Sequence, residues 1–90
     1  MERILNTQFL LMARYEGAAM IPADTVRKDF FPNLTHRIFL RKIADGDIKL
    51  PLVQMEASQK SAKGVDIRDL ASYYDERRDQ ARRELEKLHD

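Results

Sequence analysis

The hydrophobic residues of this chain come in short groups separated by turn residues. Together the groups predict a helix, a helix-turn-helix, a hairpin and a long final helix. The first helix is expected from Thr7 to Tyr15, with Asn6 or Thr7 as its cap and Gly17 at its end. Nearly every position from Phe9 to Ala13 is apolar, so this helix must be covered on more than one side. The monomer could cover one face and a partner subunit another, although simple burial in the core explains the pattern equally well.

Two short helices joined by a tight turn are predicted next. Pro22 suits the first position of a helix that runs to Phe30, and Pro32 prevents its continuation. Thr35 can cap the following helix, which is expected to end at the turn Asp45–Gly46–Asp47. The connection between the two helices is short, as a helix-turn-helix requires.

A β-hairpin is predicted after these helices. Residues Leu50–Glu56 alternate partially and are expected to form the first strand, and Val65–Ile67 can pair back as a short second strand. The intervening segment, Ala57–Gly64, is small, polar and basic, which is typical of a turn. In this interpretation Met55 belongs to the first strand, Ser58–Lys63 form the exposed tip, and Gly64 permits a tight return.

The final helix is expected to begin near Asp66, which can cap it. Apolar or small residues recur every seven positions at Ile67, Tyr74, Ala81 and Leu88. Beyond Tyr74 this stripe thins and arginines alternate with acids, which predicts a protruding helix with i,i+4 ion pairs. A second subunit could pack against it, but its apolar content is too low to assign a coiled coil.

Composition bounds the class of protein. Ninety residues correspond to one small domain, expected to span residues 1–90 with terminal helices for oligomerisation. No cysteine is present, which excludes disulfides and thiolate metal sites and favours a cytoplasmic location. No apolar run approaches the roughly 20 residues that span a bilayer, and the N-terminus has no signal-peptide pattern, so we expect no membrane association.

The sequence offers little for catalysis. It contains two histidines and three glycines, with no glycine-rich phosphate loop and no evident base beside its serines. We therefore expect no enzyme, no cofactor and no metal site. The formal net charge is only +1, but residues 34–63 hold six lysines and arginines against three acids, whereas residues 75–90 are nearly balanced. A basic centre suits a polyanion-binding face, although an unevenly charged solvated surface would look the same.

The predicted helix after Thr35 carries the strongest binding signal. Arg37 and Arg41 are four residues apart, so both can point into one groove of DNA, where arginine bonds guanine in bidentate fashion. Thr35 and His36 stand at the helix start, where phosphate or base contacts are usual. Lys42 could orient the helix or extend over the core. A solvated helix face is the alternative for the two arginines.

The predicted hairpin tip adds a second set of donors. It holds two lysines and short polar side chains, which suit contacts with the DNA backbone or the minor groove. An ordinary hairpin tip without a ligand is the alternative. The candidate contacts are Gln59, Lys60, Ser61 and Lys63.

Several stretches of the chain resemble the pyocin activator protein family (PrtN-like). The most specific are S-Q-K-S-A-K-G-V at residues 58–65 and D-L-A-S-Y-Y-D-E-R-R at residues 69–78. Weaker matches are N-T-Q-F-L-L-M-A-R-Y at residues 6–15, I-P near D-F-F-P-N-L-T at residues 29–35, and L-R-K-I-A-D-G-D-I-K-L-P-L-V at residues 40–53. The resemblance covers Asn6 to about Leu88, which is nearly the whole chain.

This resemblance implies a small phage- or prophage-associated transcriptional regulator of bacteria. The family's namesake switches on phage-tail bacteriocin genes by binding DNA upstream of them. At the level of the fold alone, the chain is also similar to small excisionases and to MerR-type winged helices, a similarity that transfers function poorly. We therefore expect a mostly α-helical protein with a small β-hairpin, arranged as a winged helix-turn-helix.

The function expected from the sequence is that of a sequence-specific regulator, most simply an activator, which binds double-stranded DNA as a homodimer or higher homo-oligomer. RNA polymerase or a phage repressor are further possible partners. One alternative is an excisionase-like factor that coats and bends DNA. Another is an anti-repressor, a protein-binding module that acts through the first and last helices.

Overall fold

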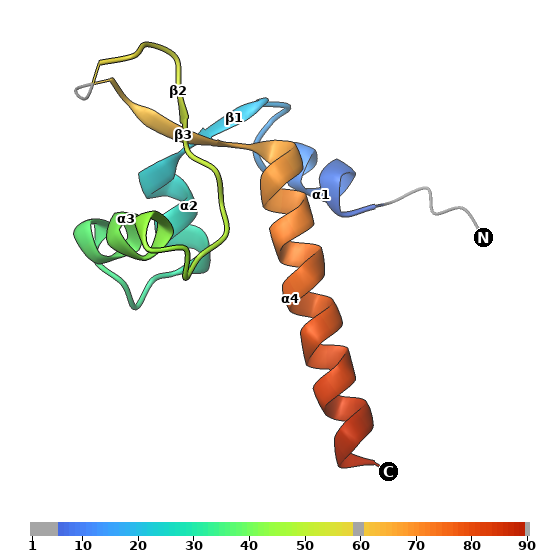
Figure 1. Cartoon of the computed structure of the whole chain (residues 1–90). Coiled ribbons are helices and arrows are strands. Elements are labelled where there is room, and N and C mark those ends of the chain that lie inside the picture. The colour runs from blue at the N-terminus through green and yellow to red at the C-terminus, as the bar shows by residue number, and fades with distance from the viewer. Residues whose placement is uncertain (1–5, 59–60, 90) are drawn as a thin grey trace.

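The computed structural model describes residues 6–58 and 61–89, and over these it contains four helices and one three-stranded antiparallel sheet (Figure 1). Most of the regular structure is helical, as expected. The elements in chain order are α1 (Thr7–Arg14), β1 (Met20–Pro22), α2 (Ala23–Phe30), α3 (His36–Ala44), β2 (Val53–Gln54), β3 (Lys63–Asp66) and α4 (Ile67–Leu88).

Three of the helices begin at the residues that local sequence predicts. The side chains of Asn6, Thr35 and Asp66 each accept a hydrogen bond from a backbone N–H two or three residues further on, at 2.8, 3.2 and 2.8 Å. These bonds satisfy amides that a helix start leaves without an intrahelical acceptor. After α3, Gly46 takes a φ of +82°, a conformation that glycine adopts without strain.

The sheet differs from the expected hairpin by one strand. The strand order is β1-β3-β2, so β3 lies in the middle and pairs with both neighbours. The β2–β3 hairpin is confirmed, but β1 was not expected. Pro22, predicted as the first residue of α2, is instead the last residue of β1 and the N-cap of that helix. A proline is tolerated there because β1 is an edge strand, on which one side of the backbone needs no partner.

The hairpin strands are also shifted from their predicted bounds. The first strand covers only Val53–Gln54 rather than Leu50–Glu56, because Ile48 and Leu50 turn inward to the core and Met55 lies outside the strand, 79% exposed. The second strand is Lys63–Asp66 rather than Val65–Ile67, since Ile67 already belongs to α4.

Gly64 has a different role from the predicted tight return. It lies inside β3, opposite Pro22 on one side and Val53 on the other, and its φ is not positive. A Cβ atom at this position would come within 2.7 to 2.9 Å of the Met20 side chain. A larger residue at this position would therefore have to displace the Met20 side chain, which packs closely over the central strand.

A single hydrophobic core joins the helices and the sheet. Each of β1, α2, α3, β3 and α4 contributes a side chain that is almost completely buried. The Phe31 ring, in the link between α2 and α3, lies 5.0 Å from the Phe39 ring and 6.1 Å from the Tyr73 ring. The five most deeply buried side chains are Ile21, Val26, Phe39, Val65 and Leu70.

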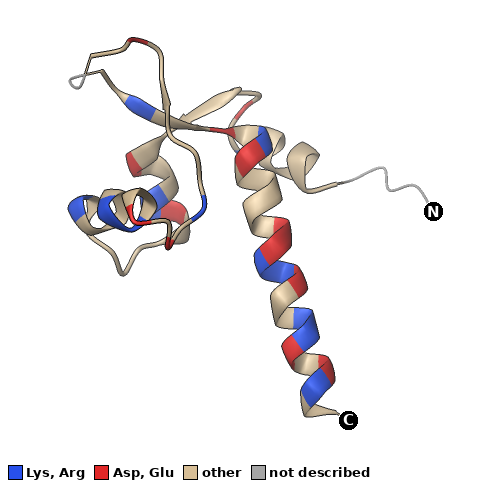
Figure 2. Cartoon of the chain, in the orientation of Figure 1, with Lys and Arg blue, Asp and Glu red and all other residues tan. Residues whose placement is uncertain are grey.

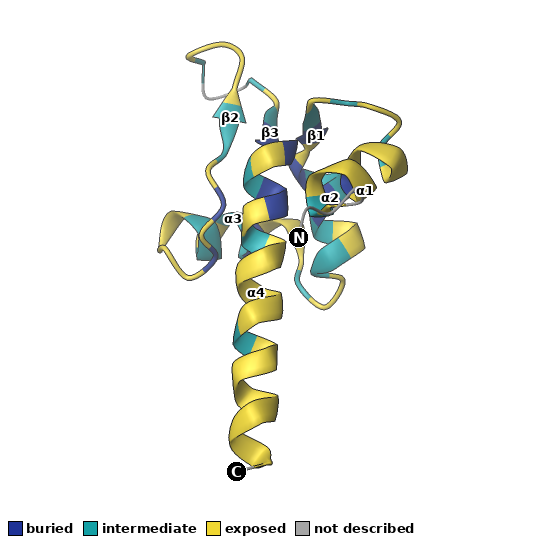
Figure 3. Cartoon of the chain, turned by 90° about the vertical axis from the view of Figure 1, so that its right-hand side faces the viewer, coloured by how far each residue is buried: buried dark blue, intermediate teal, exposed yellow. Residues whose placement is uncertain are grey.

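Helix α4 is anchored at its start and projects from the body along most of its length (Figure 3). Its buried residues are Ile67, Leu70 and Ala71, and nearly every position after Tyr73 is exposed. The predicted protrusion is therefore confirmed. The predicted i,i+4 ion pairs are wrong. Among the described residues, the side-chain hydrogen bonds in the distal half of α4 are those from Gln80 to Glu84 and from Arg83 to Gln80. Exposed ion pairs gain too little energy in water to fix long side chains. No helix in the described part of the chain is long and apolar enough to cross a membrane.

Candidate nucleic-acid interface

Helix α3 is held by its apolar side and presents its basic side to solvent. Phe39 is completely buried, and Ile38 and Ile43 are half-buried beside it, which matches the predicted apolar face. Arg37 and Arg41 are exposed. Figure 2 shows lysines and arginines along α3. The two arginines are thus available to an external anion while the helix that carries them is fixed.

A polar network connects α2 to the start of α3. Asp24 Oδ1 accepts a hydrogen bond from Arg27 Nε at 2.7 Å and lies 3.0 Å from His36 Nδ1. Arg27 also donates from Nη1 to the backbone carbonyl oxygen of Leu34, at 2.8 Å. The hydrogen bond from Arg27 is the main cause that lowers the pKa of the Asp24 carboxyl, and His36 and Lys28 act in the same direction. Asp24 therefore remains ionised and fixes the histidine next to the helix start.

The hairpin and α3 enclose a small cleft. Its volume is about 270 Å³, and it opens between the start of α2, the first turns of α3 and the strand β3. Three predicted contact residues, His36, Ser61 and Lys63, meet here although the chain separates them. The lining residues are Pro22, Ala23, Asp24, His36, Leu40, Ser61, Ala62 and Lys63.

The other predicted contacts lie outside this cleft. The exposed Arg37 and Arg41 belong to the same helix but do not line it. Lys42 is half-buried, and the Thr35 hydroxyl oxygen accepts the capping hydrogen bond from the Ile38 N–H. Gln59 and Lys60 fall outside the described residues. Sequence reasoning did not anticipate Asp24 at this site, because an aspartate in a first helical turn has an ordinary role in stabilising the helix start.

Comparison with known proteins identifies the family. The family described as Pyocin activator protein PrtN matches residues 7–81, which contain α1, the whole sheet, α2, α3 and most of α4. The chain belongs to the pyocin activator protein family. No curated protein and no solved structure matches it. The resemblance inferred from the sequence is confirmed, and the family description supports a role in regulating pyocin genes.

This pyocin activator family member exposes apolar side chains on α1 and on the adjoining part of α4. Phe9, Leu10 and Tyr74 are 50%, 54% and 46% exposed. Leu10 and Tyr74 help to line a groove of about 440 Å³ between α1, α2 and α4. Helix α1 is tied down at its ends, where Thr7 donates to Asp75 at 2.5 Å and Tyr15 donates to Asp29 at 2.6 Å. The predicted need for cover on a second side of α1 is thus visible as an exposed apolar face.

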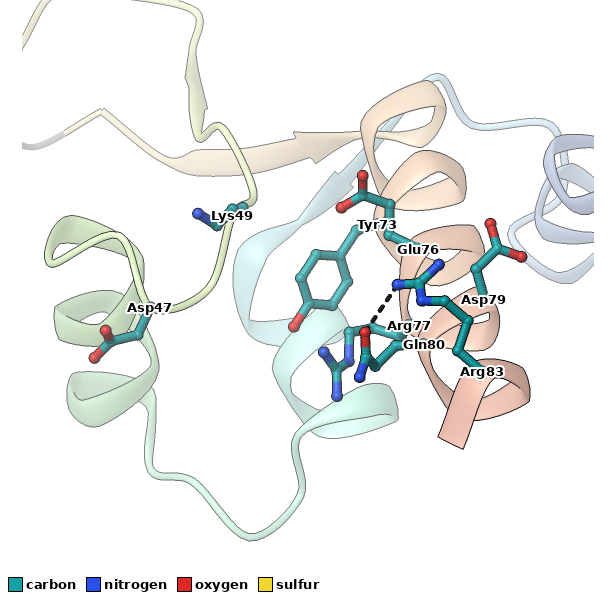
Figure 4. A pocket seen from close by; sticks show the side chains of 8 residues that line it. All are labelled: Asp47, Lys49, Tyr73, Glu76, Arg77, Asp79, Gln80 and Arg83. Atoms are coloured by element: carbon teal, nitrogen blue, oxygen red, sulfur yellow. Dashed lines mark hydrogen bonds between the residues drawn. The ribbon is translucent and has the colours of Figure 1, made fainter. Parts of the chain in front are cut away.

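A third concave region has mixed charge (Figure 4). This cleft of about 250 Å³ lies between the turn after α3 and the middle of α4, and equal numbers of acidic and basic side chains line it. Arg83 donates to the side-chain oxygen of Gln80 at 2.8 Å, as Figure 4 shows. Such a lining does not favour a polyanion. Among residues 6–58 and 61–89, no three His, Asp or Glu side chains are grouped so that they could hold a metal ion.

Proposed function

We propose that this chain is a sequence-specific, DNA-binding regulator of phage or bacteriocin genes, and that it acts as an activator. In this proposal α2 and α3 form a helix-turn-helix and the β2–β3 hairpin is its wing. The family assignment supports the regulatory role. The basic face of α3 supports the choice of double-stranded DNA as the partner.

The observation that carries the proposal is the orientation of α3. Its nine residues correspond to about 14 Å of helix, a length that the major groove of DNA accommodates. Phe39 anchors one side in the core, so Arg37 and Arg41 are presented together on the other. In the complex these arginines contact base edges, and each bidentate pair with guanine discriminates by about 1–3 kcal/mol. Thr35, His36 and Lys42 orient the helix.

The hairpin provides contacts that position the complex. Lys63 and Ser61 lie at the cleft beside the start of α3, which is where the DNA backbone passes when α3 enters a groove. Together with Gln59 and Lys60, they hold the flanking phosphates or the minor groove. Such contacts raise affinity for every sequence and make binding weaken as salt increases.

We also propose that two copies bind together. The exposed apolar residues of α1 and Tyr74 of α4 form the contact between protomers, because Leu10 and Tyr74 expose apolar surface at one groove and large exposed apolar patches mark interaction sites. The active form is then a homodimer or a higher homo-oligomer. In a twofold dimer the two α3 helices reach successive major grooves, and the half-sites are about 34–36 Å apart.

Binding selection on random duplexes tests the proposal. The selected sites should share one motif and, for a dimer, repeat it as paired half-sites. Mobility-shift titrations with Arg37→Ala and Arg41→Ala should then show a loss of roughly tenfold or more on the selected site. The matched control is Arg78→Ala, an exposed arginine of α4. Equal binding by the parent and both α3 variants would show that α3 is not the reading element.

Other outcomes of the same work point to the alternative functions. An extended, phased footprint with strong bending would identify an excisionase-like architectural factor. Absence of duplex binding at low salt, combined with binding to a phage repressor, would identify an anti-repressor. The exposed apolar face of α1 is the observation that favours a protein partner in that case. Contact with RNA polymerase would be tested on the selected promoter by measuring transcription in vitro.

A further inference from the structure

The contact between Asp24 and His36 joins the two helices of the candidate DNA-binding unit. His36 Nδ1 lies 3.0 Å from Asp24 Oδ1, and both side chains line the cleft beside α3. The His36 side chain is 52% exposed, so an external ligand can reach its ring. Of the two ring nitrogens of His36, only Nδ1 has a partner among the described residues. The second nitrogen, Nε2, is therefore available to a ligand.

The chemistry of Asp24 determines which ring nitrogen carries the proton. An ionised carboxylate can only accept a hydrogen bond, so Nδ1 must donate. Asp24 is held in this state by Arg27 at 2.7 Å and by Lys28 at 3.6 Å. Because a neutral imidazole has one N–H, its Nε2 then carries a lone pair and acts as an acceptor. In the neutral ring Asp24 thus fixes the hydrogen-bonding character of the nitrogen that a ligand meets.

We propose that Asp24 is a positioning residue which makes His36 an acceptor for an amino group on a base edge. This inference rests on the proposed DNA-binding function. A neutral His36 then favours adenine N6 or cytosine N4, both of which donate in the major groove, and disfavours guanine N7 and O6, which accept. The specificity contact is distinct from the base contacts proposed for Arg37 and Arg41.

Protonation reverses this preference. Histidine changes charge between about pH 5 and 8, and a doubly protonated ring donates from both nitrogens. His36 then favours guanine or a phosphate oxygen. The other charged groups around it are Arg27 and Lys28 of α2, which share Asp24, Lys63 across the cleft on β3, and Arg37 on its own helix. Histidine is the side-chain type whose charge ordinarily changes over this range of pH, so the change is assigned to the histidine ring.

The substitution Asp24→Asn tests the inference at constant ring charge. We expect the asparagine oxygen to stay with Arg27, which can only donate, and the amide NH₂ to turn to Nδ1, which moves the ring proton to Nε2 and converts that nitrogen from acceptor to donor. We expect binding selection at about pH 8 to change at one base position, from adenine or cytosine in the parent to guanine in the variant. The relative affinity for the two bases should shift roughly fivefold or more. The matched control is Asp29→Asn, which removes a carboxylate at the other end of α2, where it accepts from Tyr15 and pairs with Arg14.

A measurement on the free protein isolates the positioning role. Long-range ¹H–¹⁵N correlation spectra of the full chain at about pH 8 should show His36 protonated at Nδ1 in the parent and in Asp29→Asn, and at Nε2 in Asp24→Asn. A merely structural role for Asp24 would not move this signature. A third variant, His36→Gln, leaves the bond between Asp24 and Arg27 in place and should lose the pH dependence of base preference, since an amide does not change charge over this range of pH.

The outcomes separate this inference from the function on which it rests. It is overturned if the parent carries its ring proton on Nε2, or if Asp24→Asn selects the same bases as the parent. In either case the parent still binds a defined duplex and the proposed function stands. If the parent binds no duplex, the proposed function fails and the base preference fails with it.

Discussion

The exposed faces of α3 and α1 differ in chemistry and in the way each helix is anchored to the rest of the protein. Helix α3 exposes arginines and is fixed by a completely buried Phe39 and by the network around Asp24. Helix α1 exposes apolar side chains and contributes only Leu11 to the core. The basic helix is therefore anchored by a completely buried ring and a polar network, whereas α1 packs against α4 and leaves most of its apolar side chains exposed.

This difference indicates which kind of partner suits each face. A helix that reads base edges is best oriented before it meets its ligand, because ordering a mobile side chain on binding costs free energy and lowers the affinity. A helix with an uncovered apolar side gains its remaining burial from a partner. The two faces can thus be tested separately, since they share a core but no exposed residue.

The largest expected effect comes from Phe39→Ala, which removes the support that both faces share through the core. Loss of a fully buried phenylalanine should lower the free energy of unfolding by about 3–5 kcal/mol. Urea denaturation monitored by circular dichroism measures this. A loss below about 1 kcal/mol would mean that α3 is not anchored as described.

Leu10→Ser should separate the faces at the level of association. The residue is already 54% exposed, so the monomer should fold, while the loss of its burial between protomers should raise the dimer dissociation constant roughly tenfold. Sedimentation equilibrium measures the constant. Met55→Ser, which changes an exposed methionine of the hairpin, is the matched control. A parent that stays monomeric at high micromolar concentration would remove α1 as a dimer contact.

Thr35→Ala should weaken the start of α3 by about 1 kcal/mol, because the Thr35 hydroxyl caps the Ile38 N–H. Thermal unfolding of the parent and the variant measures the difference. Thr25→Ala, within α2, changes a threonine with no capping role and should have a smaller effect. If both variants lose the same stability, the cap has no special contribution.

Lys63→Ala should reduce the salt dependence of DNA binding rather than its sequence preference. If Lys63 neutralises one phosphate, the slope of log affinity against log salt should fall by about 1. Titrations from low to moderate salt on the selected duplex measure this slope. Lys87→Ala, near the end of α4, should leave it unchanged. An altered base preference in Lys63→Ala would place the hairpin among the reading elements.

The smallest effect concerns acid stability at the start of α4. The Arg68 side chain is the main cause that lowers the pKa of Asp66 to about 2, with the Arg68 backbone N–H next. A carboxyl whose pKa is lower in the folded state stabilises above its unfolded pKa, near 4, and loses this contribution as pH falls towards about 2. Melting temperatures of the parent should therefore drop over this range more than those of Asp66→Asn. Parallel curves for the two proteins would contradict the assignment.

Local signals in the sequence predicted the parts of the fold that depend on neighbouring residues. The caps at Asn6, Thr35 and Asp66 each use a side chain and an amide at most three positions apart. The burial of Phe39 follows from the periodicity of α3. The strand β1 has no such signal, because its three residues become a strand only by pairing with β3 across a long stretch of chain.

In the candidate site, too, features that depend on neighbouring residues could be predicted and features that depend on distant residues could not. Its exposed arginines could be predicted, because helical spacing puts Arg37 and Arg41 on one side. The contact of Asp24 with His36 could not, because those residues are 12 positions apart and meet only through the geometry of the turn between α2 and α3. The role of Gly64 depends on Met20 of another strand, which a local pattern does not reveal.

The junction between β3 and α4 limits how this chain can change in length. Asp66 ends the central strand and caps the helix that begins at the next residue, so no loop separates the two elements. One inserted residue at this point would turn α4 by about 100° about its axis. Leu70 and Ala71 would then leave the core, whereas a longer connection between β2 and β3 would cost little. Insertions and deletions among related chains should therefore collect in the hairpin connection and avoid the junction.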